Sequence, residues 1–150
     1  MVALMLAVVL ECKPVELRPY TVKGNTKRGV SVVVTEAAMT VNEGGKVLFT
    51  DEHPPFKVLI ASDDGWVATK GPYPSGSVQI APVKEGATLV TVDPLEHLTA
   101  DERKKVPETS CGTSWFKGWK NEAAALELEV AQDRAPSLKV RVKPDGTVTR

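Results

Sequence analysis

The chain has 150 residues, with 19 basic and 19 acidic side chains and a formal net charge of zero. This balance excludes a polybasic, histone-like protein, although a local basic face remains compatible with it. A hydrophobic fraction of 42% and a charged fraction of 25% are typical of a soluble globular protein. The length suits one domain with residues left for an extension.

The chain opens with an apolar run over residues 2–10, followed by Glu11 and Cys12. The run is too short to cross a bilayer, which takes about 20 residues. It also lacks a basic n-region and a small-residue cleavage site. Its Val, Leu and Met content favours a first strand over residues 2–12, buried on both faces. An export signal is the alternative.

The following segments are rich in β-branched and apolar residues and are separated by Gly and Pro. They cover residues 29–41, 46–50, 56–61, 77–81 and 87–92. Short strands at this spacing, with no amphipathic helix between them, predict a mainly all-β protein. We expect a small barrel or sandwich over residues 1–98.

The residue pattern of the sequence changes after Pro94, and we expect residues 99–150 to form a C-terminal extension. Thr99 with Glu102 three residues later is a capping box, which predicts a short helix. Residues 121–131 are ambiguous, because helix formers precede an alternation typical of a strand. A Pro-Asp-Gly turn at 144–146 predicts a terminal hairpin.

The sequence contains no recognisable catalytic or metal-binding motif. His53 and His97 lie outside any H-E-x-x-H pattern, and the G-x-S-x-G frame is absent. Cys12 and Cys111 are isolated, which argues against a zinc site. Two unpaired thiols in a reducing compartment are favoured over one disulfide. We therefore expect no enzyme, no metal and no cofactor.

A basic loop precedes the first long β-branched run, and no acidic residue occurs within it. It contains Arg18, Tyr20, Lys23, Lys27 and Arg28. Lys and Arg can follow a phosphate backbone, and an exposed ring offers a face on which an unpaired base stacks. The alternative is a solvated hairpin whose charges only keep it soluble.

The order of these pieces resembles the single-stranded-DNA-binding proteins of filamentous bacteriophages, the gene V type. The resemblance covers residues 1–98 and rests chiefly on FKVLIASDDG followed by PYPSGSVQI. It implies a five-stranded OB-type barrel, a homodimer or higher cooperative assembly, and coating of single-stranded DNA in phage replication. Residues 100–150 have no counterpart in that family. The hairpin VKEGATLV also lacks the aromatic residue often found there.

The resemblance implies that the basic loop is a wing that contacts DNA. Pro54 and Pro55 stand where the family has another aromatic residue, and the nearby Phe56 and Lys57 are its candidate substitutes. Tyr73 lies in the Tyr-Pro-Gly segment, with a stacking or a packing role. In the extension, rings alternate with cations at Trp115, Phe116, Lys117, Trp119 and Lys120. They suit a base-stacking arm, although core packing or a partner surface is also compatible with them.

The sequence therefore predicts a protein that coats single-stranded DNA with little sequence preference, in the cytoplasm of the host cell and without a membrane partner. Two alternatives stay open. The first is a small phage or virion structural or assembly β-protein. The neutral net charge and an extension that can exchange between subunits both suit this alternative. The second is an exported or lipid-anchored β-domain, which rests on the apolar N-terminal run alone.

Overall fold

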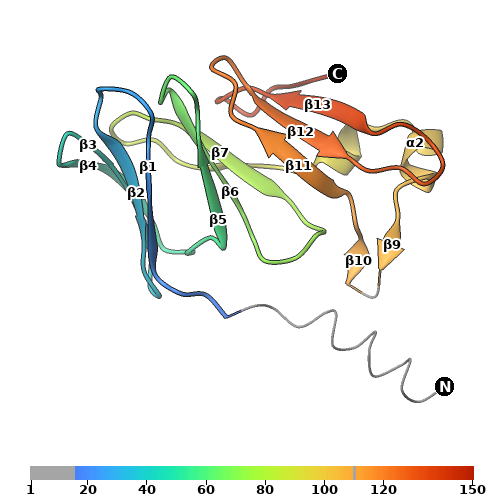
Figure 1. Ribbon diagram of the computed structural model, residues 1–150, viewed down its shortest axis with the longest axis horizontal. Helices are drawn as coiled ribbons and strands as arrows, with labels where there is room; N and C mark the ends of the chain where they lie inside the picture. The colour runs from blue at the N-terminus through green and yellow to red at the C-terminus, as the bar shows by residue number, and fades with distance from the viewer. Residues whose placement is uncertain (1–15, 110) are drawn as a thin grey trace.

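The computed structural model describes residues 16–109 and 111–150 (Figure 1). The first sheet is an antiparallel meander in the order β1-β2-β3-β4. Its strands are β1 (Tyr20–Lys23), β2 (Val30–Val34), β3 (Met39–Glu43) and β4 (Lys46–Asp51). Along β2, buried and half-buried positions alternate, as expected for a strand with one face on a core.

Two further meanders follow in chain order. The middle sheet contains β5 (Lys57–Ile60), β6 (Trp66–Lys70), β7 (Val78–Pro82) and β8 (Val90–Val92). The last sheet contains β11 (Phe116–Lys120), β12 (Leu126–Val130), β13 (Leu138–Val142) and β14 (Val148–Thr149). Between them lie the 3-10 helix η1 (Pro94–His97), the helix α2 (Ala100–Lys104) and a small ladder of β9 (Glu108–Thr109) with β10 (Gly112–Thr113).

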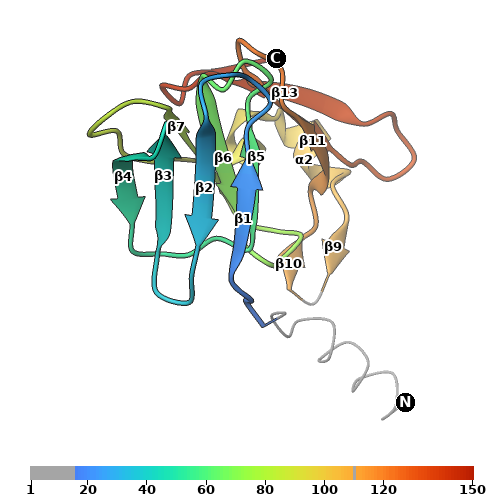
Figure 2. The same cartoon turned by 60° about the vertical axis from the view of Figure 1, so that its left-hand side comes forward.

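The three larger sheets stack as layers, with the middle sheet between the other two (Figures 1 and 2). All five residues of β6 are buried, which requires cover on both faces. Val67 and Ala81 belong to the core shared with the first sheet. Trp66, Ala68 and Ile80 belong to the core shared with the last sheet. Because successive side chains of a strand point to opposite faces, β6 and β7 contribute side chains to both cores.

The mainly β class is confirmed, whereas a closed five-stranded barrel is not found among the described residues. Within each four-stranded sheet, strands pair only with their neighbours along the chain, so the first and last strands do not meet. Residues 116–149 form a sheet with its own meander. Because that sheet shares a core with residues before 98, the two expected segments pack as one body.

The capping-box helix and the terminal hairpin expected after residue 98 are both confirmed, and the structure resolves the ambiguous stretch between them. Thr99 caps α2 and forms the capping box with Glu102. The alternating stretch within residues 121–131 is the strand β12. The turn between β13 and β14 is closed by a hydrogen bond from the Gly146 N–H to the Lys143 carbonyl oxygen.

Two predictions concern residues outside the described part of the chain. The strand or export signal over residues 2–12 is one, and the state of Cys12 is the other. Cys111 is disulfide-bonded, so the expectation of an unpaired thiol is wrong at this position. In the described part of the chain, no helix combines the length and the apolar character that crossing a membrane requires.

Candidate nucleic-acid interface

Residues Tyr20–Lys23 of the expected basic loop form the strand β1, and the rest of the loop, between β1 and β2, is anchored on a buried carboxylate. Asp64, in the turn between β5 and β6, is fully buried and accepts hydrogen bonds from the backbone N–H groups of Asn25 (3.0 Å) and Thr26 (3.1 Å). The Thr26 hydroxyl donates to the same carboxylate. Burial alone would raise the pKa of Asp64, but these hydrogen bonds and the nearby Arg28 charge together lower it.

Arg28 holds the same loop from its other end. Its Nε donates to Glu43 Oε1 (2.7 Å), and its Nη1 donates to the Asp64 carbonyl oxygen (2.9 Å). Gly24 passes so close to Asp64 that an added Cβ would lie 2.5 Å from Oδ1. A loop fixed in this way is docked on the middle sheet, because a carboxylate from the turn between β5 and β6 satisfies its backbone donors. That the loop contacts DNA stays a prediction.

The cations of the loop therefore differ in whether their charge is available to a ligand. Arg28 is occupied by its ion pair and its carbonyl contacts. Lys23 and Lys27 are exposed, and neither makes an ion pair within residues 16–109 and 111–150. They lie away from the hollows described next, none of which they line.

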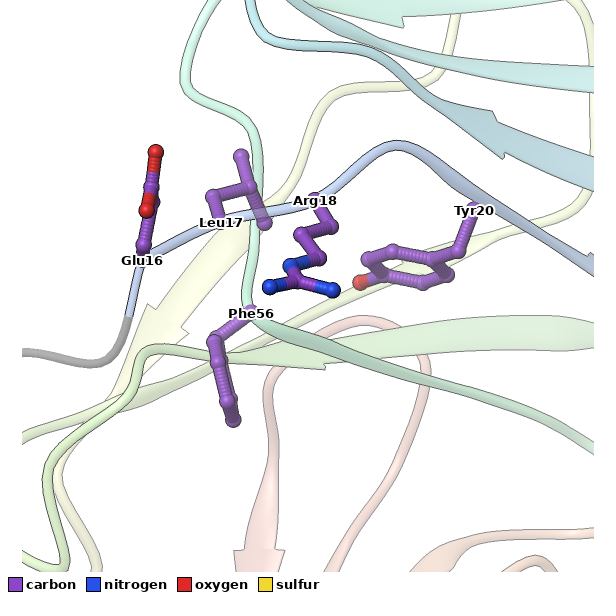
Figure 3. A pocket seen from close by; sticks show the side chains of 5 residues that line it. All are labelled: Glu16, Leu17, Arg18, Tyr20 and Phe56. Atoms are coloured by element: carbon purple, nitrogen blue, oxygen red, sulfur yellow. The ribbon is translucent and has the colours of Figure 1, made fainter.

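Tyr20 and Arg18 belong to a different surface, at the start of β1. With Leu17, Phe56 and Glu16 they line an open hollow of about 390 Å³, shown in Figure 3. The Tyr20 hydroxyl donates to the Pro55 carbonyl oxygen (2.9 Å), which fixes the ring. Burial raises the pKa of Tyr20 to about 12. The guanidinium of Arg18 points toward the space between the two rings.

Phe56 also lines a second hollow, of about 210 Å³. Its remaining wall includes Lys57, Lys70, Tyr73 and Phe116, and no carboxylate lines it. Lys57 is exposed, and Tyr73 is 36% exposed. Because Phe56 lines both hollows, four rings and two exposed cations border one continuous surface. We call Arg18, Tyr20, Phe56, Lys57, Tyr73 and Phe116 the aromatic face.

Lys70 lies beneath this surface and was not expected to matter. It is 4% exposed, and its Nζ donates to the carbonyl oxygens of Tyr73 (2.8 Å) and Ser75 (3.2 Å). The same nitrogen lies 5.2 Å from the ring centre of Trp115 and 5.0 Å from that of Phe116. Burial, and to a lesser extent the Lys57 charge, lowers the pKa of Lys70 to about 8. In sequence it only ends a five-residue stretch, WVATK, so no signal pointed to it.

The extension residues divide between core and surface. Trp115 is fully buried, and its indole N–H donates to the Gly76 carbonyl oxygen (2.7 Å), so the prediction that it stacks bases is wrong. Phe116 packs edge-on between Trp115 and the half-buried Trp119. Lys117 faces Glu129 on the neighbouring strand (3.6 Å). Lys120 is exposed at the end of β11.

Of the thirteen residues predicted to contact nucleic acid, six therefore meet on the aromatic face. The described residues contain no cluster of three or more His, Cys, Asp or Glu that could hold a metal ion. The fold and the site together define a three-layer, mainly β protein with one face of rings and cations. No family model matches the chain, and neither the curated proteins nor the solved structures give a match.

Proposed function

We propose that the protein binds single-stranded nucleic acid, and DNA in particular, along the aromatic face. The observation that carries this proposal is the meeting of four rings and two cations around hollows that share Phe56. Base–ring stacking contributes about 1–3 kcal/mol per base and tolerates any sequence, since every base has a π face. Cations beside the rings attract the backbone that links the bases.

Two features of the face favour a ligand of this kind. Tyr20 is held by its hydroxyl, and Phe116 is held between two tryptophan rings, so stacking on either ring costs little side-chain entropy. Arg18 and Lys57 make no ion pair with any carboxylate in the described residues, so their charges are available. Glu16, which also lines the first hollow, opposes an anion there.

The test is the anisotropy of a labelled oligo(dT) of about 16 nucleotides. Tryptophan quenching suits this protein poorly, because Trp66 and Trp115 are fully buried. We expect affinity to fall between about 50 and 200 mM salt, with a slope of about −0.7 per phosphate neutralised. Duplex DNA should compete weakly, since its bases are already stacked.

Two substitutions at exposed positions of the face make the test specific. Tyr73→Ala should weaken binding by about 1–3 kcal/mol if a base stacks there. Arg18→Gln should lower the salt slope, whereas Lys84→Gln removes the same charge from an exposed site that lines neither hollow and should change nothing. Equal affinity in all three variants would refute the aromatic face as the binding surface.

Cooperative coating by a homodimer and a role in phage replication stay predictions that rest on the resemblance to the gene V type. One observation favours assembly as a second candidate function. Each larger sheet is open, and β4 is an edge strand with Val47 53% exposed. Unpaired edges are templates for strand addition from another copy. Large assemblies in light scattering without nucleic acid would favour this candidate.

A further inference from the structure

We propose that Lys57 and Lys70 form a binding site for a single phosphate group in the second hollow. This inference rests on the proposed function and deepens it, because it says where one backbone phosphate of the nucleic acid binds. The site would take a phosphate mono- or diester whose attached base lies against a neighbouring ring.

The two lysines are brought together by the sheet register. Lys57 on β5 is the direct cross-strand partner of Lys70 on β6. Like charges facing each other across a ladder are destabilising. Within residues 16–109 and 111–150, neither lysine makes an ion pair. The pair is thus a concentration of positive charge without a compensating anion from the described chain.

Lys70 is buried, and hydrogen bonds fix the position of its ammonium group. The carbonyl oxygens of Tyr73 and Ser75 accept two of its three N–H donors, which leaves one donor for a ligand. The rings of Trp115 and Phe116 lie beside the ammonium group. A buried ammonium costs free energy unless hydrogen bonds and an opposite charge compensate it. The carbonyl oxygens supply the hydrogen bonds, and a phosphate would supply the charge.

The walls of the second hollow select the kind of anion. No carboxylate lines it, in contrast to the first hollow with Glu16. Phe56, Tyr73 and Phe116 surround the two lysines. A phosphate attached to a planar base uses both features, since the lysines bind the charged group and a ring binds the base. A bare phosphate would use only the first.

The groups that face Lys70 set how the site responds to pH. Lys57 faces it from β5, and the Tyr73 carbonyl oxygen faces it from the adjoining loop. The uncharged rings of Trp115, just before β11, and of Phe116, its first residue, lie beside it. Val78 is its register partner on β7, and His53 shares a third hollow with it. Because the pKa of Lys70 lies at about 8, its charge is lost as the pH rises through that value. Phosphate binding should weaken over the same range.

The first experiment titrates inorganic phosphate into the full chain carrying ¹³C-labelled lysine and follows the Lys70 side-chain signal by NMR, assigned with Lys70→Met. Phosphate should shift this signal and raise the pKa of Lys70 above its value in chloride. A Lys70 signal and pKa unchanged by phosphate would overturn the site.

The second experiment measures oligo(dT) affinity and its salt slope. Lys70→Met should weaken binding about 10- to 100-fold, as expected for a lost hydrogen bond between charged groups. In Lys70→Met the salt slope should decrease in magnitude by about 0.7, the value for one phosphate. The double variant with Lys57→Gln should show the same decrease, because both lysines hold one phosphate. Lys57 is exposed, so its substitution leaves the fold intact. Lys84→Gln is the control.

The two experiments separate the two proposals. Oligo(dT) binding that is equal in the wild type, Lys57→Gln and Lys70→Met would overturn the phosphate site and leave the proposed function standing. A phosphate response at Lys70 in a protein that binds no oligo(dT) would support the site and refute the proposed function.

Discussion

Asp64→Asn tests the idea that one buried carboxylate anchors the basic loop. The change keeps the side chain's shape and replaces one acceptor oxygen with a donor. Asp64 has a φ of 60°, which Asn tolerates as well as Asp, so backbone strain stays the same. The substitution therefore isolates the contribution of the carboxylate.

The size of the effect follows from the contacts. Asp64 accepts two backbone hydrogen bonds, from Asn25 and Thr26, and one from the Thr26 hydroxyl. A hydrogen bond to a charged group contributes about 1.5–3 kcal/mol. Asn25 and Thr26 are exposed, so water replaces part of what is lost. We expect a loss of about 2–4 kcal/mol in the free energy of unfolding, or about 5–15 °C in Tm.

The assay is thermal and urea unfolding followed by circular dichroism, with Asp63→Asn as the matched control. Asp63 is exposed and makes one local hydrogen bond, to the Gly65 N–H (3.0 Å), so its substitution should cost less than about 1 kcal/mol. Asp64→Asn that is no more destabilising than Asp63→Asn would refute the anchoring role.

Acid should act on the wild type in the same direction. The folded-state pKa of Asp64 is lowered from its ordinary value of 3.8. The stability that it contributes is therefore present above that pH and lost as the pH falls through the lower folded-state value. The Asp64→Asn variant lacks this part of the acid dependence, so the difference in stability between variant and wild type should shrink progressively as the pH falls below 3.8.

Two further predictions concern close contacts in the loop and at the chain's last residue. Gly24→Ala should lower the free energy of unfolding by about 1–3 kcal/mol in urea, because its Cβ would meet Asp64, whereas Gly71→Ala meets nothing within 4 Å and should be neutral. The Arg150 side chain and the Thr99 backbone hold the pKa of Glu102 at about 2. Arg150→Ala should raise that pKa toward 4.5 in an NMR titration; an unchanged value would rule out the contact.

The local predictions succeeded where a few adjacent residues determine the outcome. The Thr99 and Glu102 pair describes a helix start by itself, because a capping box satisfies its own backbone donors. The turn at Gly146 likewise depends on a φ of 89° that glycine adopts without strain. Neither prediction required knowledge of what packs against the segment.

The layering could not be read from the sequence, because it depends on contacts between distant segments. The strand β6 was not predicted, since its five residues lie between Gly65 and Gly71 and end in a lysine. Its burial on both faces appears only once two other sheets cover it. Residues 29–41 were expected as one strand, but the Thr35 N–H donates to the Ala38 carbonyl oxygen and closes a turn between β2 and β3.

The candidate site shows the same division. Rings and cations of the right kind were visible in sequence, but which of them share a surface depends on how the layers stack. Phe56 and Phe116 are far apart in the chain and line the same hollow. Lys70 escaped notice because a buried charge looks like any exposed one until its neighbours are known.

The position of the middle sheet has a consequence for synthesis on the ribosome. The first two meanders emerge before the last one, so Val67 and Ala81 can be buried against the first sheet early. Trp66, Ala68 and Ile80 are buried only when the strands of residues 116–149 have been made. Until then the nascent chain presents a large apolar surface on one side, which is the kind of surface that chaperones recognise. Slow translation of residues 116–149 would prolong that exposure.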